Sequence, residues 1–161
     1  MEERFEILSK LVWGVHGDVQ KLKTQIAGEL GIKAAHVFLI YLLRNYPEGL
    51  TAAELGGMNR STGGLISRET AELLEQGIIT TDKESAHRRY GCKYLLTEKG
   101  GEMAGRISDF AMKVQNFVSA DIPREDLVIF YRTFDTLLKG FDKFTGKHHI
   151  TNTIKDKGEQ Q

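Results

Sequence analysis

Hydrophobic positions recur every three or four residues over most of the chain, and this spacing predicts amphipathic helices. The first such segment covers residues 2–30, and Gly31 interrupts it. A second segment, over residues 34–46, is apolar around much of its circumference, which indicates a buried central helix that ends before Pro47. The apolar stripe of the first segment consists of Phe5, Leu8, Val12, Val15, Val19 and Leu22.

A strong helix start follows at Thr51. The hydroxyl of Thr51 and the carboxylate of Glu54 have the spacing of a capping box, in which each side chain accepts a hydrogen bond from the other residue's backbone N–H. Leu50 and Leu55 stand where a hydrophobic staple is expected. We therefore predict a short helix that begins at Thr51 and ends near residues 56–57.

A further helix is predicted over residues 62–76, with Gly77 as its C-terminal cap. Its inner face is expected to consist of Ile66, Leu73 and Leu74. The period then changes, because residues 78–81 have β-branched character and residues 90–96 alternate with aromatics. The polar stretch over residues 82–89 is accordingly interpreted as the charged tip of a hairpin.

Two more helices follow the hairpin. Thr97 is placed to cap the first, and Pro123 opens the second in the first turn, where proline is tolerated. The first stripe is Met103, Ile107, Phe110, Val114 and Phe117, and the second is Leu127, Phe130, Phe134, Leu137, Leu138 and Phe141.

This order of elements is that of a winged helix-turn-helix between outer helices, so the predicted fold class is mainly α with a small β hairpin (α+β). We assign residues 1–30 to an N-terminal dimerisation helix, 31–100 to the winged helix-turn-helix lobe and 101–144 to C-terminal dimerisation helices. The outer stripes exceed what one small lobe can cover, which predicts a homodimer. Residues 145–161 are polar and without periodicity, and we expect a disordered tail.

The composition of the chain restricts its class of protein and its cellular location. The chain has 161 residues, enough for one domain with helical extensions, and no apolar stretch of the roughly 20 residues that span a bilayer. We see no signal peptide, and the single cysteine, Cys92, cannot form an internal disulfide, so a cytoplasmic location is expected. The 22 basic residues balance 22 acidic ones, which argues against nucleic-acid binding, because phosphate contacts need Lys and Arg. The segment from Lys83 to Lys93 nevertheless has a local net charge of +3, from four basic residues against one acidic residue.

Three stretches together resemble the MarR (multiple antibiotic resistance regulator) family of winged-helix transcriptional regulators. They are residues 30–37, residues 50–55, and residues 74–79 followed by 95–100. The resemblance spans about residues 5–144. It implies that the second helix of the motif enters the major groove of DNA, that the wing reaches the backbone or minor groove, and that a ligand loosens the DNA-binding state.

The resemblance also implies DNA-binding residues. By position these are Thr62, Gly63, Gly64, Ser67 and Arg68 in the recognition helix, and Arg88 and Arg89 in the wing. Physical chemistry favours the same roles, because short side chains and free backbone N–H groups at a helix start suit phosphate oxygens. An arginine can bind guanine through two hydrogen bonds or bind a phosphate.

Several positions depart from the family pattern. His87 stands where the family has an acidic residue before its wing arginines, and Asn59 and Thr70 occupy positions where apolar residues are expected. The recognition helix also carries Glu69, Glu72 and Glu75. Gly63 and Gly64 lie in its first turn, where each costs about 1 kcal/mol relative to alanine.

Other interpretations of the same residues stay open. Arg88 and Arg89 fit a solvated hairpin tip as well as a DNA contact, and Arg68 is spaced to pair with Glu72 along the helix. Cys92, on a predicted strand, is expected to be a small packing residue rather than an oxidant sensor. The five histidines contain no pair at helical i, i+4 spacing, so no metal site is expected.

Trp13 and His16 share one flank of the first helix, with Tyr41 expected opposite. These three residues are candidates for the lining of an effector cavity between the dimerisation helices and the DNA-binding lobe, and ordinary packing is the alternative. No Gly-rich phosphate loop, metal-spaced cluster or nucleophile–base pattern is present in the sequence, so we expect no enzyme activity, catalytic residue or cofactor.

The predicted function is a sequence-specific DNA-binding transcriptional regulator. We expect a ligand-responsive repressor that binds a pseudo-palindromic operator as a homodimer, with a small-molecule effector and no membrane partner. The alternative is a winged-helix protein-interaction module with weak or no DNA binding.

Overall fold

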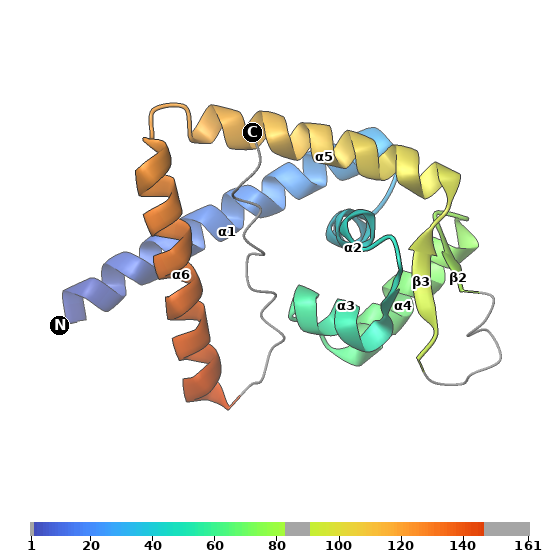
Figure 1. The fold of residues 1–161 in the computed structure, drawn as a ribbon, viewed down its shortest axis with the longest axis horizontal. Coiled ribbons are helices and arrows are strands. Elements are labelled where there is room, and N and C mark those ends of the chain that lie inside the picture. The colour runs from blue at the N-terminus through green and yellow to red at the C-terminus, as the bar shows by residue number, and fades with distance from the viewer. Residues whose placement is uncertain (1, 83–90, 147–161) are drawn as a thin grey trace.

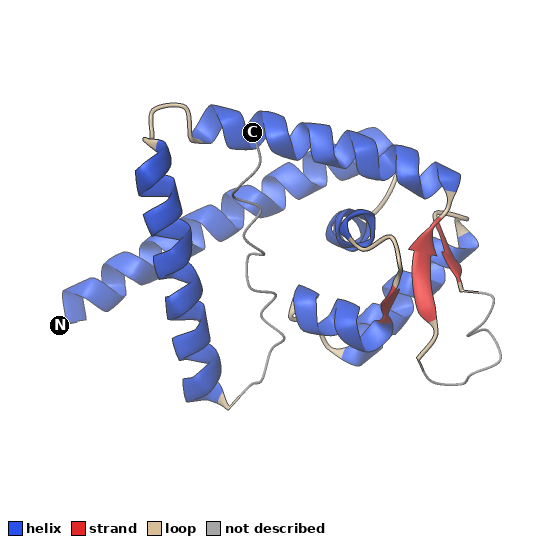
Figure 2. Cartoon of the chain, viewed as in Figure 1, coloured by secondary structure: helices blue, strands red, loops and turns tan. Residues whose placement is uncertain are grey.

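A computed structural model describes residues 2–82 and 91–146 of the chain (Figure 1). The described part is mostly helical, with a small antiparallel sheet (Figure 2). Its elements in chain order are α1 (Glu2–Leu30), α2 (Ala34–Asn45), β1 (Leu50–Thr51), α3 (Ala52–Asn59), α4 (Gly63–Glu75), β2 (Ile79–Thr81), β3 (Lys93–Leu96), α5 (Glu98–Val118) and α6 (Arg124–Thr145). The predicted fold class is confirmed.

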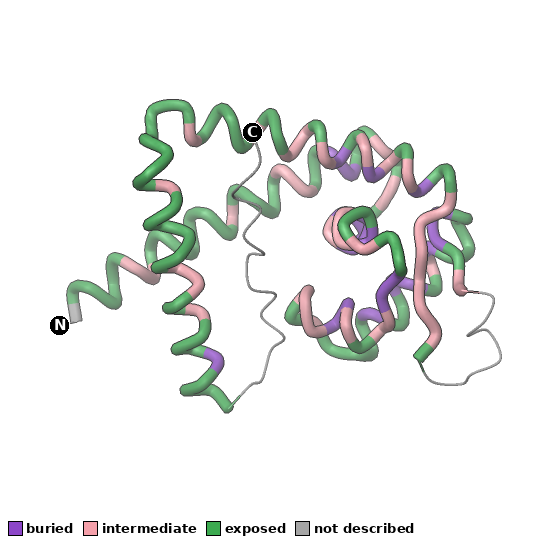
Figure 3. Tube along the Cα trace, viewed as in Figure 1, coloured by how far each residue is buried: buried purple, intermediate pink, exposed green. Residues whose placement is uncertain are grey.

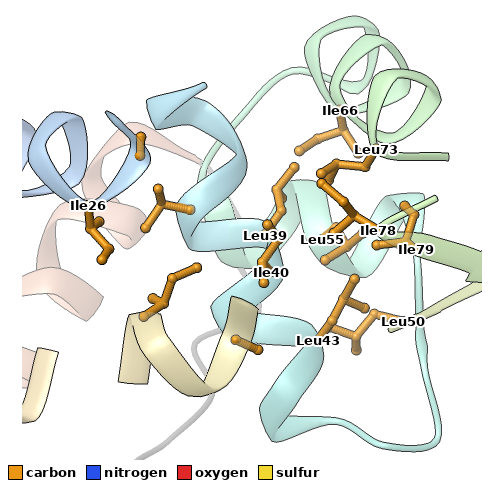
Figure 4. Close-up of a cluster of buried hydrophobic side chains, with 14 residues drawn as sticks. Ile26, Leu39, Ile40, Leu43, Leu50, Leu55, Ile66, Leu73, Ile78 and Ile79 are labelled. Atoms are coloured by element: carbon orange, nitrogen blue, oxygen red, sulfur yellow. The ribbon is translucent and has the colours of Figure 1, made fainter. Parts of the chain in front are cut away.

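The α2 helix is the centre of the molecule. Figure 1 shows it end-on, between α1 and α5 on one side and α3 and α4 on the other. In Figure 4, Leu39 and Ile40 of α2 lie in one apolar cluster with Ile66 and Leu73 of α4, while Leu43 lies beside Leu50. The prediction of a buried central helix is therefore confirmed.

The sheet has the strand order β1-β3-β2, with β3 antiparallel to both neighbours. Leu50 of β1 is paired with Tyr94, and Ile79 of β2 is paired with Leu96. Gly49, just before β1, has a φ of +80°, and a Cβ there would lie 2.9 Å from the Tyr94 carbonyl oxygen. A glycine is therefore required for β1 to approach β3.

Local capping signals determine where the helices start. Thr51 and Glu54 form the predicted capping box, with the Thr51 N–H donating to Glu54 at 2.8 Å and the Glu54 N–H donating to Thr51 Oγ1 at 3.3 Å. The hydrogen bonds from Thr51 lower the pKa of Glu54. Thr97 Oγ1 likewise accepts from the Gly100 N–H at 3.1 Å at the start of α5.

Some boundaries differ from the prediction. Helix α3 continues through residues 56–57 to Asn59 and ends where Arg60 adopts a left-handed conformation with a φ of 52°. Pro123 is the N-cap of α6 rather than a residue of its first turn, and β3 begins at Lys93, one residue after Cys92. The hairpin tip and most of the expected tail lie outside the described residues.

One residue of α4, Leu74, does not belong to the core, contrary to the prediction. Ile66 and Leu73 are buried as predicted, but Leu74 is 38% exposed. Thr70 is buried in its place, because its position four residues after Ile66 is on the inner face. Its hydroxyl donates to the Ile66 carbonyl oxygen at 2.9 Å, so a polar residue is accommodated there without losing its hydrogen bond.

No single described helix is long and apolar enough to span a membrane. Helices α1 and α2 together have the length and the apolar composition of a membrane span, but the chain bends by 86° between them.

Candidate nucleic-acid interface

The turn between α3 and α4 positions the candidate recognition helix. After Arg60 ends α3, the Ser61 N–H donates to the Gly56 carbonyl oxygen at 3.0 Å. Asn59 Nδ2 donates to Ser61 Oγ at 2.8 Å. Asn59 thus replaces the expected apolar contact with a hydrogen bond inside the turn, which stabilises the position at which α4 begins.

Helix α4 has a buried face and an exposed face. Ile66, Thr70 and Leu73 are buried against the core. Gly64, Ser67 and Arg68, which are spaced by three or four residues, are exposed and share the other face. The structure therefore brings the sequence-predicted residues of this helix together on one accessible surface.

The start of α4 has free hydrogen-bond donors. Thr62 is the N-cap, with extended backbone, but its side chain makes no capping hydrogen bond to a described residue. Gly63 and Gly64 are exposed, and a Cβ on either would meet nothing within 4 Å. The first N–H groups of a helix have no partner within the helix and attract anions, so this end is chemically suited to a phosphate oxygen.

Arg68 does not form the predicted alternative contact with Glu72. Lys33 Nζ donates to both carboxylate oxygens of Glu72 at 2.6 Å, and this ammonium lowers the pKa of Glu72. Arg68 forms no hydrogen bond or ion pair with another residue of the described ranges. Its guanidinium is therefore available for an external partner.

The predicted wing arginines, Arg88 and Arg89, lie outside the described residues. The framework of the wing is present, because β2 and β3 are paired and the Asp82 N–H donates to the Lys93 carbonyl oxygen at 3.0 Å.

A second surface consists of exposed apolar residues on α1 and α6. Figure 3 shows that most of the N-terminal half of α1 and most of α6 are exposed. Phe130 of α6 is 55% exposed, although it stacks on Phe134 with ring centroids 5.7 Å apart. Within the described ranges, α6 makes no extensive packing contact with another element. Its apolar stripe therefore lacks an extensive partner among the residues that the structure describes.

Apolar hollows lie between α1 and α6. One has a volume of about 850 Å³ and a second, which shares several of its lining residues, has a volume of about 530 Å³. Trp13 lines the second, His16 lines both, and the two rings form an edge contact with centroids 6.2 Å apart. Tyr41 is not brought to them, because it packs against the core cluster from α2. Arg60, which sequence reasoning did not select, also lines the second hollow.

Sequence reasoning missed a buried polar cluster between α2 and α4. His36 Nε2 lies 2.9 Å from Glu69 Oε2 and 3.3 Å from Glu72 Oε2. His36 is completely buried and Glu69 is nearly so. The signal available in the sequence was two glutamates three residues apart in one helix and a histidine within the apolar part of another.

Comparison with solved structures identifies the fold. A MarR transcriptional regulator from Methanosarcina mazei Go1 has a TM-score of 0.73 and 15% sequence identity, over 86% of this chain and 99% of that one. A MarR-family regulator from Silicibacter pomeroyi has a TM-score of 0.71 and 17% identity, over 81% and 86%. NadR in complex with 4-hydroxyphenylacetate has a TM-score of 0.69 and 15% identity, over 81% and 91%.

No protein-family model matches the sequence, and no curated protein matches it. The structural comparisons nevertheless agree with one another, and they cover 86% and 81% of this chain. The chain has the MarR-family winged-helix fold, as the resemblance in sequence predicted.

Proposed function

We propose that this chain, with the MarR-family winged-helix fold, is a sequence-specific DNA-binding transcriptional regulator that acts as a homodimer. The observation that carries the proposal is the exposed face of α4. There Ser67 and Arg68 lie next to a helix start with free N–H donors, and Arg68 has no partner among the described residues. The role is one of binding rather than of catalysis, as it is for the regulators that share the fold.

The proposed contacts follow from the geometry of α4 in the major groove. The N–H groups at Thr62, Gly63 and Gly64 bind a phosphate, and the two glycines allow close approach of the backbone. Ser67 and Arg68 face the base edges, where arginine binds guanine O6 and N7. Arg88 and Arg89 of the wing bind phosphate or the minor groove, which adds affinity with little sequence information.

The acidic residues of α4 oppose this role less than the sequence suggested. Glu69 is buried, and Glu72 is part-buried and bound by the ammonium of Lys33. Only Glu75, at the far end of α4, is an exposed glutamate of this helix. The negative charge is therefore directed mainly towards the protein and not towards a DNA backbone.

A homodimer is supported by the apolar surface of α1 and α6. Large exposed apolar patches mark interaction sites, and here the patch covers two helices at the end of the molecule away from the winged lobe (Figure 1). A two-fold dimer would present two copies of α4 to successive major grooves. The operator is then a pseudo-palindrome with half-site centres about 10 bp apart.

An effector site is proposed at the smaller hollow, which Trp13 and His16 line; the larger one, lined by Phe130 and Phe134, belongs to the proposed dimer interface. The walls of the smaller hollow are mainly apolar, and Arg60, whose guanidinium also binds Asp142, adds a cationic group to its lining. NadR, whose structure holds 4-hydroxyphenylacetate, is a precedent for a small aromatic acid on this fold. We propose a repressor that such a molecule releases from DNA, acting in the cytoplasm, where Cys92 stays reduced.

The second candidate function is a protein-interaction module. It is favoured by the zero net charge and by Leu65 and Leu74, which are 39% and 38% exposed on α4. A DNA-binding protein of neutral net charge must rely on local charges, whereas exposed leucines suit a protein partner.

Selection of bound fragments from a random DNA pool tests the proposal. We expect enrichment of a two-fold symmetric sequence, followed by tighter binding to that sequence than to mixed genomic DNA at low and moderate salt. A protein that enriches no sequence and does not bind mixed DNA at low salt would instead fit the protein-interaction module.

A further inference from the structure

We propose that His36, Glu69 and Glu72 form a binding site for a divalent transition-metal cation, with zinc as the reference ion, between α2 and α4. One imidazole nitrogen and two carboxylate oxygens, one from each residue, lie within 4.8 Å of one another. The cation would join the central helix to the candidate recognition helix. The site itself does not depend on the proposed function.

The spacing of the ligand atoms fits such an ion. With zinc–ligand bonds of about 2.0–2.1 Å, two ligand atoms of a tetrahedral site lie roughly 3.3 Å apart. His36 Nε2 lies 2.9 Å from Glu69 Oε2 and 3.3 Å from Glu72 Oε2. All three ligand atoms lie within 4.8 Å of one another, so side-chain movements can bring them around one cation, and the fourth position is left for water.

The burial of these groups points to a ligand. Both ring nitrogens of His36 and Glu69 Oε2 are buried and, within the described ranges, have no hydrogen-bond partner of acceptable geometry. Buried polar atoms without partners are rare in folded proteins and unfavourable, because they lose hydration without compensation. A cation would supply the missing partner of His36 Nε2 and of Glu69 Oε2 together.

The types of ligand atom restrict which cations the site can bind. An imidazole with two carboxylates suits zinc and similar first-row divalent ions better than calcium or magnesium, which prefer oxygen ligands alone. Three protein ligands leave an open coordination position, and Glu72 is part-exposed, which gives the ion a route from solvent. Lys33 competes at that route, because its ammonium binds the carboxylate of Glu72 at 2.6 Å.

The competition between Lys33 and a cation for Glu72 provides a test that is specific to this site. The Lys33 side chain is 60% exposed, so its ammonium can move into water when a cation arrives. Lys33→Ala removes this ammonium and should raise the affinity for zinc about 3-fold or more, because zinc then no longer has to displace it from the Glu72 carboxylate. A surface site elsewhere would not respond in this way.

The experiment is a titration of the full chain with zinc against a chromogenic chelator. The variant H148Q/H149Q is used as background throughout, because two adjacent histidines can bind zinc by themselves. We expect one zinc ion per chain, and Glu69→Gln and Glu72→Gln should each weaken binding about 10-fold or more. Glu75→Gln, the same change at an exposed position of α4, should leave the affinity unchanged.

His36→Gln completes the set and should also weaken binding about 10-fold or more. If this buried variant fails to fold, the part-exposed Glu72→Gln variant and Lys33→Ala still decide the question. The proposal is overturned if the H148Q/H149Q background binds no zinc. It is also overturned if Glu69→Gln and Glu72→Gln bind zinc as the background does, or if Lys33→Ala does not raise the affinity.

The consequence for DNA rests on the proposed function. By fixing α4 against α2, zinc should raise the affinity for a selected operator about 3-fold or more in the background and not in Glu72→Gln. An equal effect in both would show that zinc acts on DNA binding from another site. Absence of DNA binding in every state would contradict the proposed function alone, because the zinc titration does not use DNA.

Discussion

Arg60 Nη2 donates a hydrogen bond to Asp142 Oδ2 at 3.1 Å and so joins the end of α3 to the last turns of α6. The only other side-chain hydrogen bond between α6 and the rest of the described residues runs from Gln115 Nε2 to Tyr131 Oη, at 2.9 Å. Since α6 has no extensive packing contact of its own in this range, the Arg60–Asp142 pair links the proposed dimerisation helix directly to the helix-turn-helix.

This pair should contribute measurably to stability. In a double-mutant cycle with Arg60→Gln and Asp142→Asn, we expect a coupling free energy of about 1 kcal/mol in urea unfolding at fixed protein concentration, because the Asp142 side chain is mostly buried. The more exposed Lys139–Asp135 pair on α6 is the matched control and should give about 0.3–0.5 kcal/mol. A coupling no larger than that of the control would mean that the pair does not hold α6.

Two adjacent glycines should respond in opposite ways to alanine. A Cβ at Gly100 would lie 2.0 Å from the Ile78 carbonyl oxygen, whereas a Cβ at Gly101 meets nothing within 4 Å. Gly100→Ala should therefore lower the free energy of unfolding by about 2 kcal/mol or more. Gly101→Ala should raise it by up to about 1 kcal/mol, because alanine favours the helix. Equal effects of the two changes on urea unfolding would contradict the close packing of Gly100 against the Ile78 carbonyl group, just before β2.

The homodimer should depend on the apolar stripe of α6. Replacing Phe130 and Phe134 with aspartate should dissociate the dimer, and the separated chains should be less stable, since burial of apolar area is lost. Thr136→Asp, on the exposed polar side of the same helix, is the control and should leave the dimer intact. Sedimentation at micromolar concentration distinguishes the species, and a stable, folded wild-type monomer would refute the interface.

The wing arginines should provide affinity without specificity. Arg88→Ala or Arg89→Ala should weaken binding to all DNA sequences alike, because phosphate contacts carry no base information. Each change should reduce the slope of log K against log salt by about 1. Titrations of a selected operator and of mixed DNA at several salt concentrations measure both quantities. Loss of preference at one operator position in either variant would instead assign that arginine to base readout.

The elements that the sequence predicted best depend on local chemistry. The capping box of Thr51 and Glu54 and the cap at Thr97 involve residues three positions apart, so the spacing alone indicates the helix starts. The end of α3 was misplaced because Gly56 acts as a contact residue rather than a helix terminator. A Cβ there would lie 3.5 Å from the Ser61 carbonyl oxygen, against the following turn.

The residues that the sequence could not predict depend on side-chain contacts, two of them between distant elements. Thr70 can occupy the inner face because its hydroxyl donates to a carbonyl oxygen of its own helix, which hydrophobicity does not indicate. A pair of Arg68 with Glu72 along the helix was the alternative to a DNA contact, but Lys33, the residue before α2, binds Glu72 instead. His36 meets Glu69 for the same reason, since the approach of α2 to α4 is a property of the folded chain.

The affinity of Arg68→Ala for a selected operator and for its single-base variants, across a salt series, tests the central claim most directly. If α4 reads DNA, this change should cost about 1–3 kcal/mol on the selected operator and remove the preference at one position in each half-site. Arg106→Ala, which removes an exposed arginine from α5, is the control for net charge and should leave that preference intact. Equal weakening on every sequence by Arg68→Ala, or no effect at all, would contradict the assignment of α4 as the recognition helix.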